Sequence, residues 1–366
     1  MSDSILDQVI TAKQKAAIID FDPEDIIKRL FTVLSDRERE IISRRHGLFE
    51  QPKATLEEIG KQHKVTRERV RQVENSSLKK IKENYDREIL KVVENLANSI
   101  LQEYQGIMTE HHLIDELLQV PGHSESHKSA VTFIMNQLLA DRFQSIKETS
   151  EYHKAWASLD ASWDKFLNNL RQIVKLVEDK NKPITLDDLS GAINQAEHID
   201  WTDLSLEQTA NIADVAKKID RNIYNEYGHI DWSTIKPKRM NDKIYLVLKK
   251  AGKPMHFTEI AEEINKAKFD SRVAYPATIH NELILDNKFV LVGRGIYALT
   301  EWGYKPGVVT DVIAEILRRG GKPLTKEEII EQVLNNRIVK RSTVILALMN
   351  KDKFTKNPDK TYSLKG

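Results

Sequence analysis

The apolar positions of this 366-residue chain recur mostly at the spacing of an α-helix, in short segments. The clearest example follows Thr66, where small and apolar residues fall within one arc of a helical wheel drawn at about 100° per residue. These inward-facing positions are Val70, Val73, Ser77 and Ile81, with Leu78 at their edge. The pattern predicts a helix with a narrow packed side and a wide polar side.

Helix-start signals precede this helix at short intervals. The candidate N-caps are Asp22, Ser35, Thr55 and Thr66. Asp22 stands before a proline, which suits the first helical position, and Ser35 and Thr55 are each followed three residues later by glutamate, the capping-box spacing. We therefore expect a short helix from Leu56 to about Gln62, a tight turn at 63–65, and a second helix after Thr66.

The polar side of that second helix carries the chemistry of base recognition. Residues 64–82 hold seven basic and two acidic residues. Arginine can bond guanine, glutamine can bond adenine, and glutamate can accept from cytosine in the major groove of DNA. A short helix followed by an exposed cationic helix is the helix-turn-helix geometry that places such side chains there. The predicted DNA-binding residues are Lys64, Thr66, Arg67, Glu68, Arg69, Arg71, Gln72, Asn75 and Lys79.

Charge is segregated along the chain although the total is only +1. The net charge is −2 over residues 1–52, +5 over 53–82, −6 over 83–150, −6 over 151–235 and +10 over 236–366. Basic blocks of this kind usually meet a polyanion, and acidic blocks stay away from it or meet a basic protein surface. The alternative is that the blocks are solvated faces of ordinary domains.

A Lys-Pro sequence followed by a helix cap recurs downstream. Its lysines are Lys182, Lys253 and Lys322, spaced 71 and 69 residues apart, and a weaker copy begins at Gly106. In the copy at Lys253, helical segments are followed by two apolar runs joined by Gly-Arg-Gly within 289–299, a hairpin pattern. A regular period of this length indicates repeated small modules rather than one large core.

The fold class we predict is mainly α, a multi-domain array in which a helix-turn-helix precedes several winged-helix modules of three helices and a β-hairpin. The expected segments are an N-terminal helix or tail (1–21), the helix-turn-helix (22–84), a weak winged-helix-like module (88–158), an acidic winged-helix-like module (163–235), a winged helix (239–303) and a C-terminal winged-helix module (306–366).

Residues 34–41, 46–48 and 55–74 resemble region four of sigma-seventy-type sigma factors of bacterial RNA polymerase. The resemblance implies four short helices, of which the last reads the minus-35 promoter element through Arg67, Glu68, Arg71 and Gln72. It also implies that neighbouring helices grip the β flap of core RNA polymerase. The likeness spans only about residues 22–84, and no preceding segment resembles the domain that melts promoters.

Residues from about 240 to 302 resemble the HARE-type helix-turn-helix, a winged module of the bacterial polymerase delta subunit, of chromatin regulators and of proteins beside restriction enzymes. Winged helices bind proteins about as readily as DNA. The +10 block favours a nucleic acid role for the last two modules, and the −6 blocks disfavour one for the two before them.

Features of catalysis, cofactor binding and membrane insertion are missing from the sequence. There is no cysteine, no phosphate-binding glycine loop and no nucleophile elbow. His111 and His112 are adjacent and point about 100° apart on a helix, and His123 with His127 lack a carboxylate at ligand spacing. No apolar run nears the roughly 18 residues that cross a bilayer. We expect a cytoplasmic protein that is not an enzyme, with no metal, no cofactor and no membrane contact.

Two functions fit these patterns. The first is a sigma-like protein that reads minus-35-type duplex DNA and binds core RNA polymerase. The second is a polymerase accessory protein, similar to the delta subunit, that modulates transcription without reading promoters. A nuclease or modification enzyme with targeting modules is a third class, which would need a catalytic cluster that the sequence lacks.

Overall fold

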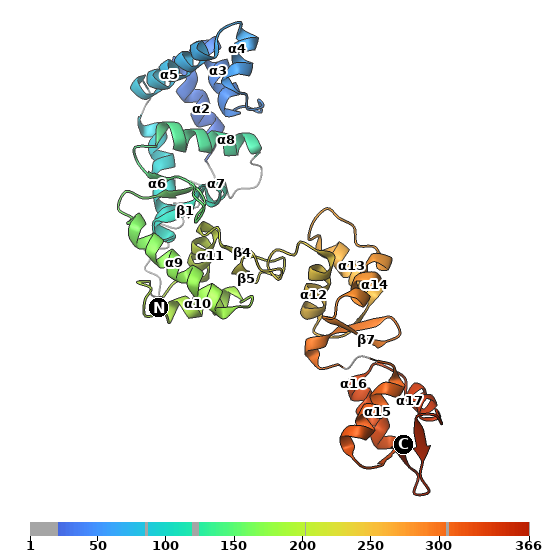
Figure 1. The fold of residues 1–366 in the computed structure, drawn as a ribbon. Helices are drawn as coiled ribbons and strands as arrows, with labels where there is room; N and C mark the ends of the chain where they lie inside the picture. Colours follow the sequence, from blue (N-terminus) through green and yellow to red (C-terminus); the bar gives the residue numbers. More distant parts are fainter. Residues whose placement is uncertain (1–20, 85–86, 119–123, 202, 305–306, 366) are drawn as a thin grey trace. The chain divides into compact units, whose positions relative to one another are not determined.

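The computed structural model describes residues 21–84, 87–118, 124–201, 203–304 and 307–365. The predicted N-terminal helix over 1–20 and His123 lie outside these residues. The described part is mainly helical with small sheets of two or three strands, which confirms the predicted fold class (Figure 1). It divides into two compact units, one reaching Asp220 and one made mostly of residues 231–366.

The first helices of the chain begin at the predicted caps. Asp22 accepts hydrogen bonds from the backbone N–H groups of Glu24 and Asp25, and Ser35 and Thr55 form complete capping boxes. Because each cap satisfies backbone donors that a helix start leaves unpaired, local sequence alone fixes where these helices begin. They are α2 (Pro23–Leu30), the 3₁₀ turn η1 (Phe31–Val33), α3 (Asp36–His46), α4 (Leu56–His63) and α5 (Arg67–Asn84).

A second group of elements follows in the same unit. Strand β3 lies between β1 and β2, antiparallel to both, and Trp156 of β3 faces Met108 and Ser145 across the sheet. The elements are α6 (Arg87–Glu103), β1 (Ile107–Thr109), α7 (Glu110–Leu117), α8 (Glu125–Phe133), the π-helical turn η2 (Ile134–Leu138), β2 (Gln144–Ile146) and β3 (Ala155–Ala157).

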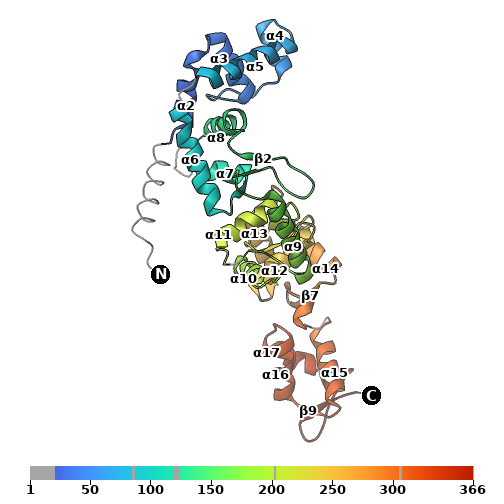
Figure 2. The same cartoon turned by 90° about the vertical axis from the view of Figure 1, so that its left-hand side faces the viewer.

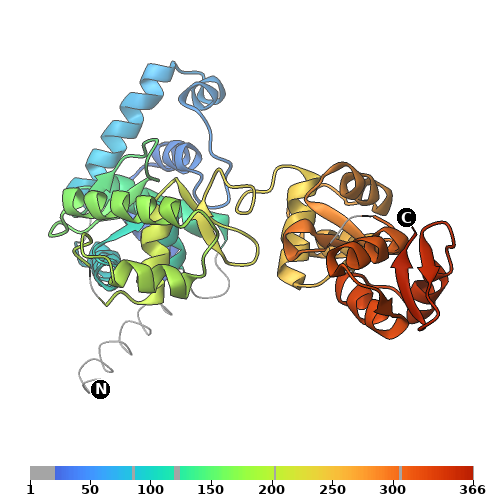
Figure 3. The ribbon, with the colours of Figure 1, turned by 60° about the horizontal axis from the view of Figure 1, so that its bottom comes forward.

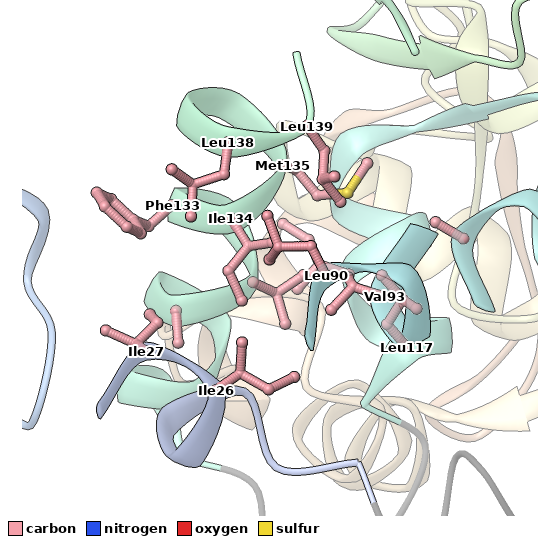
Figure 4. Packing of buried hydrophobic residues seen from close by; sticks show 14 of the residues in the cluster. Ile26, Ile27, Leu90, Val93, Leu117, Phe133, Ile134, Met135, Leu138 and Leu139 are labelled. Carbon is pink, nitrogen blue, oxygen red and sulfur yellow. The ribbon is translucent and has the colours of Figure 1, made fainter. Parts of the chain in front are cut away.

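One hydrophobic core joins α2 to this second group. Ile27 of α2 and Phe133 at the end of α8 are buried in it, together with Leu90 and Val93 of α6 (Figure 4). Phe31 meets Phe133 edge-on with ring centroids 6.0 Å apart. The first helix of the predicted helix-turn-helix segment is therefore packed against the module that follows it.

The remaining elements of the first unit repeat the pattern of helix, helix, helix and hairpin. Thr185, in the Lys-Pro copy at Lys182, accepts from the backbone N–H of Asp188 and so caps α10. The elements are α9 (Trp163–Lys180), α10 (Leu186–Asn194), α11 (Leu206–Val215), β4 (Ile219–Arg221) and β5 (Tyr227–His229).

Two winged modules form the second unit. Each has three helices, and a short strand pairs with the second strand of a hairpin. The first consists of α12 (Met240–Ala251), β6 (Met255–His256), α13 (Phe257–Ala267), α14 (Pro276–Leu285), β7 (Phe289–Gly293), β8 (Ile296–Leu299) and η3 (Thr300–Trp302). The second consists of α15 (Val309–Gly320), β9 (Leu324–Thr325), α16 (Lys326–Asn336), α17 (Arg341–Leu348), β10 (Phe354–Lys356) and β11 (Thr361–Leu364).

Candidate nucleic-acid interface

The turn between α4 and α5 is tight and depends on a glycine. Lys64 ends α4 in the left-handed conformation, with φ 56°, and the backbone N–H of Val65 donates to the carbonyl of Gly60 at 2.9 Å. A Cβ atom at Gly60 would lie 2.8 Å from the Val65 carbonyl oxygen, so only glycine allows this approach. The hydroxyl of Thr66 then accepts from the backbone N–H of Arg69, which starts α5.

The inner side of α5 is packed as its sequence pattern predicts. Val70 joins Ile41 of α3 and Ile59 of α4 in a small core of its own, and Ile81 reaches the larger core that contains α2. Ser77 is fully buried. Since one side of α5 is held along most of its length, the opposite side is fixed in orientation, and α3, α4 and α5 form one group (Figures 1 and 2).

A polar contact in the second half of α5 ties this helix to α3. The carboxylate of Glu74 lies 3.3 Å from Nε2 of His46 and 3.5 Å from Nε of Arg45. Hydrogen bonding to His46 and the nearby charge of Arg45 hold the pKa of Glu74 below its usual range, although burial acts the other way. The cationic helix is thus anchored by an ionised carboxylate on its inner side.

All nine residues that the sequence predicts for DNA contact are exposed on or beside α5. They are Lys64, Thr66, Arg67, Glu68, Arg69, Arg71, Gln72, Asn75 and Lys79. Lys64 and Thr66 lie in the turn, and the remaining seven lie along the outer side of the helix. Their assignment to DNA contact remains a prediction.

Two of the arginines are engaged within the helix. The guanidinium of Arg71 donates to both carboxylate oxygens of Glu68, at 2.9 and 2.7 Å, and Arg69 donates to the side-chain oxygen of Gln72 at 3.2 Å. This hydrogen bonding to Arg71 lowers the pKa of Glu68. Arg67 makes no hydrogen bond or ion pair to any residue that the structure describes. In the DNA-free protein, Arg67 is the arginine of the first turn that is ready for an incoming ligand.

Comparison with protein families agrees with this geometry. Residues 30–83 match the family model for sigma-70, region 4, and residues 239–302 match the HARE-HTH model, a helix-turn-helix domain described by its occurrence in ASXL and restriction endonuclease proteins. The chain combines a sigma-70 region 4 domain with a HARE-type helix-turn-helix domain. Both resemblances in the sequence are therefore confirmed, and the chain is a DNA-binding, transcription-related helix-turn-helix protein. No curated protein matches the chain.

These two families are DNA-binding helix-turn-helix types and not families of enzymes. Within the residues that the structure describes, no helix is long and apolar enough to cross a membrane. The described residues also hold no group of three or more histidines and carboxylates placed to bind a metal ion. His111 and His112 lie beside different carboxylates, Asp115 at 3.0 Å and Glu116 at 3.4 Å.

The sequence pattern did not reveal the residues that hold the region 4 domain together from behind. Glu74 sits at the edge of the polar side of α5, and its partners Arg45 and His46 look like the usual basic residues of a helix C-terminus. Lys80 of α5 likewise bonds Glu38, the capping-box carboxylate of α3. Only the spacing between helices, which sequence periodicity does not give, shows that these charges meet.

The HARE-type domain contains a buried cation that the sequence did not single out. Lys243 of α12 is 1% exposed, and its ammonium lies 2.7 Å from the carboxylate of Asp270. Asp270 also bonds Arg272. Hydrogen bonds from Lys243 and Arg272 hold the pKa of Asp270 far below its usual range. This charge cluster ties α12 to the loop before α14.

Proposed function

We propose that this protein reads minus-35-type promoter DNA through the region 4 domain and contacts core RNA polymerase. One observation carries the proposal: α5 is buried along one side and exposes Arg67, Glu68, Arg71 and Gln72 along the other. Recognition helices enter the major groove with their N-terminal turns, where these four side chains lie. Their donors and acceptors match the base edges of guanine, adenine and cytosine.

The positive charge of the same helix supplies the nonspecific part of binding. Residues 64–82 carry seven basic residues, and Lys79 lies beyond the first two turns with its ammonium 3.7 Å from Glu83. Cations of this kind contact phosphates and position a helix, whereas base edges are read by the side chains ahead of them. The proposal therefore separates the affinity of α5 for any duplex from its choice of sequence.

Polymerase contact, as the sigma-factor resemblance implies, involves the helices that flank α5. The apolar side of α2 is buried against α8 of the same chain, so a polymerase flap would meet the exposed sides of α3 and α4 instead. The division into segments 22–84, 88–158, 163–235, 239–303 and 306–366 is part of this proposal, with promoter reading assigned to the first of them.

The experiment is affinity capture of the full chain with core RNA polymerase, followed by footprinting of the captured complex on genomic DNA fragments. A footprint confined to a recurring short sequence supports promoter reading. Copurification with polymerase without any footprint selects the second candidate function instead.

That second candidate is an accessory protein that docks on polymerase and modulates it without choosing promoters. The acidic stretches favour it, because residues 83–150 and 151–235 each carry a net charge of −6. Surfaces of this sign repel DNA and complement a basic protein surface. Equal affinity for promoter and random duplexes, together with tight polymerase binding, would be its signature.

A further inference from the structure

The four modules downstream of the region 4 domain share a third helix followed by a hairpin, and these segments differ sharply in charge. The segments 124–157 and 205–229 have net charges of 0 and −1. The segment 275–301 of the HARE-type domain has two basic and three acidic residues, whereas 340–365 has seven basic and two acidic residues. The last segment alone has a strongly cationic third helix and hairpin.

The acidic residue in the turn of this last hairpin does not neutralise it. The carboxylate of Asp359 accepts from the backbone N–H and the hydroxyl of Thr361, at 3.1 and 2.6 Å, and this bonding lowers the pKa of Asp359. Asp359 is therefore committed to shaping the turn. Lys356 and Lys360 flank it, are exposed, and make no ion pair within the described residues.

The turn holds these two lysines on a defined frame. The backbone N–H of Asn357 donates to the carbonyl of Thr361 at 2.8 Å, and the N–H of Lys360 donates to the carbonyl of Asn357 at 3.0 Å. Phe354 and Leu364 pair across β10 and β11, and Phe354 is buried against the helices. The hairpin is thus anchored at its base, and its cationic tip projects at the edge of the module (Figure 3).

The start of α17 adds to the same charge. Lys340 and Arg341 are exposed at its first turn, next to Ser342 and Thr343, which are exposed hydroxyl donors. The only ion-pair contact of Arg341 among the described residues is a long one, 3.9 Å to Glu327. A helix N-terminus is itself electropositive, so the side chains and the helix dipole have the same sign here.

The HARE-type domain shows the opposite character at the equivalent place. Along α14 the exposed side holds Ile284 and Leu285, which are 62% and 81% exposed, and no basic residue. The polyanion-binding property is therefore not a general feature of the winged modules of this chain. It is confined to the last one, which lies outside both family matches.

We propose that the C-terminal module, through Lys356 and Lys360 of its hairpin and the first turn of α17, is a second duplex-DNA site that binds phosphates without reading sequence. Exposed unpaired cations on a rigid hairpin release counterions from DNA when they approach its backbone. Binding by this module adds to the binding by α5 because the two are joined in one chain. The chain then holds DNA at two places, of which only one selects sequence.

The test uses the full chain and a random-sequence duplex of about 30 base pairs, titrated at several salt concentrations. The double variant Lys356→Gln/Lys360→Gln should reduce the slope of log affinity against log salt by about 1.8, and should weaken binding about tenfold or more at roughly 0.1 M salt. The matched control is Lys288→Gln/Arg294→Gln, which removes two exposed cations from the hairpin of the HARE-type domain and should leave the slope near that of the wild type.

The hairpin variant should weaken promoter and random duplexes by the same factor, so its result is independent of whether α5 reads sequence. Melting followed by circular dichroism should show unchanged stability, since neither lysine side chain makes an ion pair in the described residues. Equal slopes for the wild type and the hairpin variant would overturn the proposal. A loss seen with single-stranded RNA or with an acidic protein, but not with the duplex, would overturn it as well.

Discussion

Arg71 and Glu68 form a two-fold hydrogen-bonded ion pair on the outer side of α5, with donor–acceptor distances of 2.9 and 2.7 Å. The pair lies in the turns that the proposal places in the major groove. DNA binding therefore begins with a competition between the Glu68 carboxylate and DNA for the same guanidinium. This competition makes Glu68 a residue that opposes nonspecific binding.

Replacing Glu68 with alanine should strengthen binding to random duplexes, because it removes a negative charge from the DNA-facing side and releases Arg71. The salt slope should rise by roughly 0.9, the value expected for one more phosphate contact. Preference for promoter over random duplex should fall. The matched control is Glu57→Ala, which breaks the exposed ion pair with Lys61 on α4. If both variants behave alike, the competition between Glu68 and DNA does not exist.

The contact of Glu74 with His46 and Arg45 should make the region 4 domain sensitive to acid. The pKa of Glu74 is lowered in the folded chain, so its contribution to stability is complete above the ordinary value of 4.5 and is lost as pH falls through the folded value. The urea midpoint of the wild type should thus fall more steeply below pH 4.5 than that of Glu74→Gln.

Glu83→Gln serves as the control for this pH experiment, because Glu83 is exposed on the same helix and has only a distant contact to Lys79. Its pH dependence should follow the wild type. A Glu74→Gln profile that also parallels the wild type would show that Glu74 does not anchor α5.

The core shared by α2, α6 and α8 should make the region 4 domain and the following module unfold together. Ile27 is fully buried there, and Ile27→Ala should cost about 2–5 kcal/mol of unfolding free energy. Hydrogen exchange should show protection falling in α2 and α8 alike. Val92→Ala, at a 44% exposed position of α6, should have little effect. Loss of protection in α2 alone would contradict a common core.

In the HARE-type domain, Asp270→Asn should lower the melting temperature because it leaves the ammonium of Lys243 buried beside a neutral partner. Adding Lys243→Met to that variant should recover much of the loss, since the buried charge is then removed. Melting of the three proteins measures both effects. A double variant no more stable than Asp270→Asn would show that the buried charge is not the cause.

Local sequence was sufficient to predict the helix starts of the region 4 domain, since Asp22, Ser35, Thr55 and Thr66 act on backbone groups two or three residues away. The exposed and buried sides of α5 also followed from periodicity. The burial of α2 against α8 did not, because it joins residues about a hundred positions apart. The hairpins were predicted where glycine or Asn-Pro-Asp marked a turn, but the unpaired lysines of the last one emerged only from the bonds of Asp359.

The most direct test of promoter reading by α5 compares single substitutions on promoter and random duplexes at one salt concentration. Arg71→Ala and Gln72→Ala should each cost about 1–3 kcal/mol on the promoter and reduce its advantage over random sequence. Lys79→Ala should weaken both duplexes equally, because it removes a phosphate contact. If all three substitutions change promoter and random binding by the same factor, α5 does not read bases.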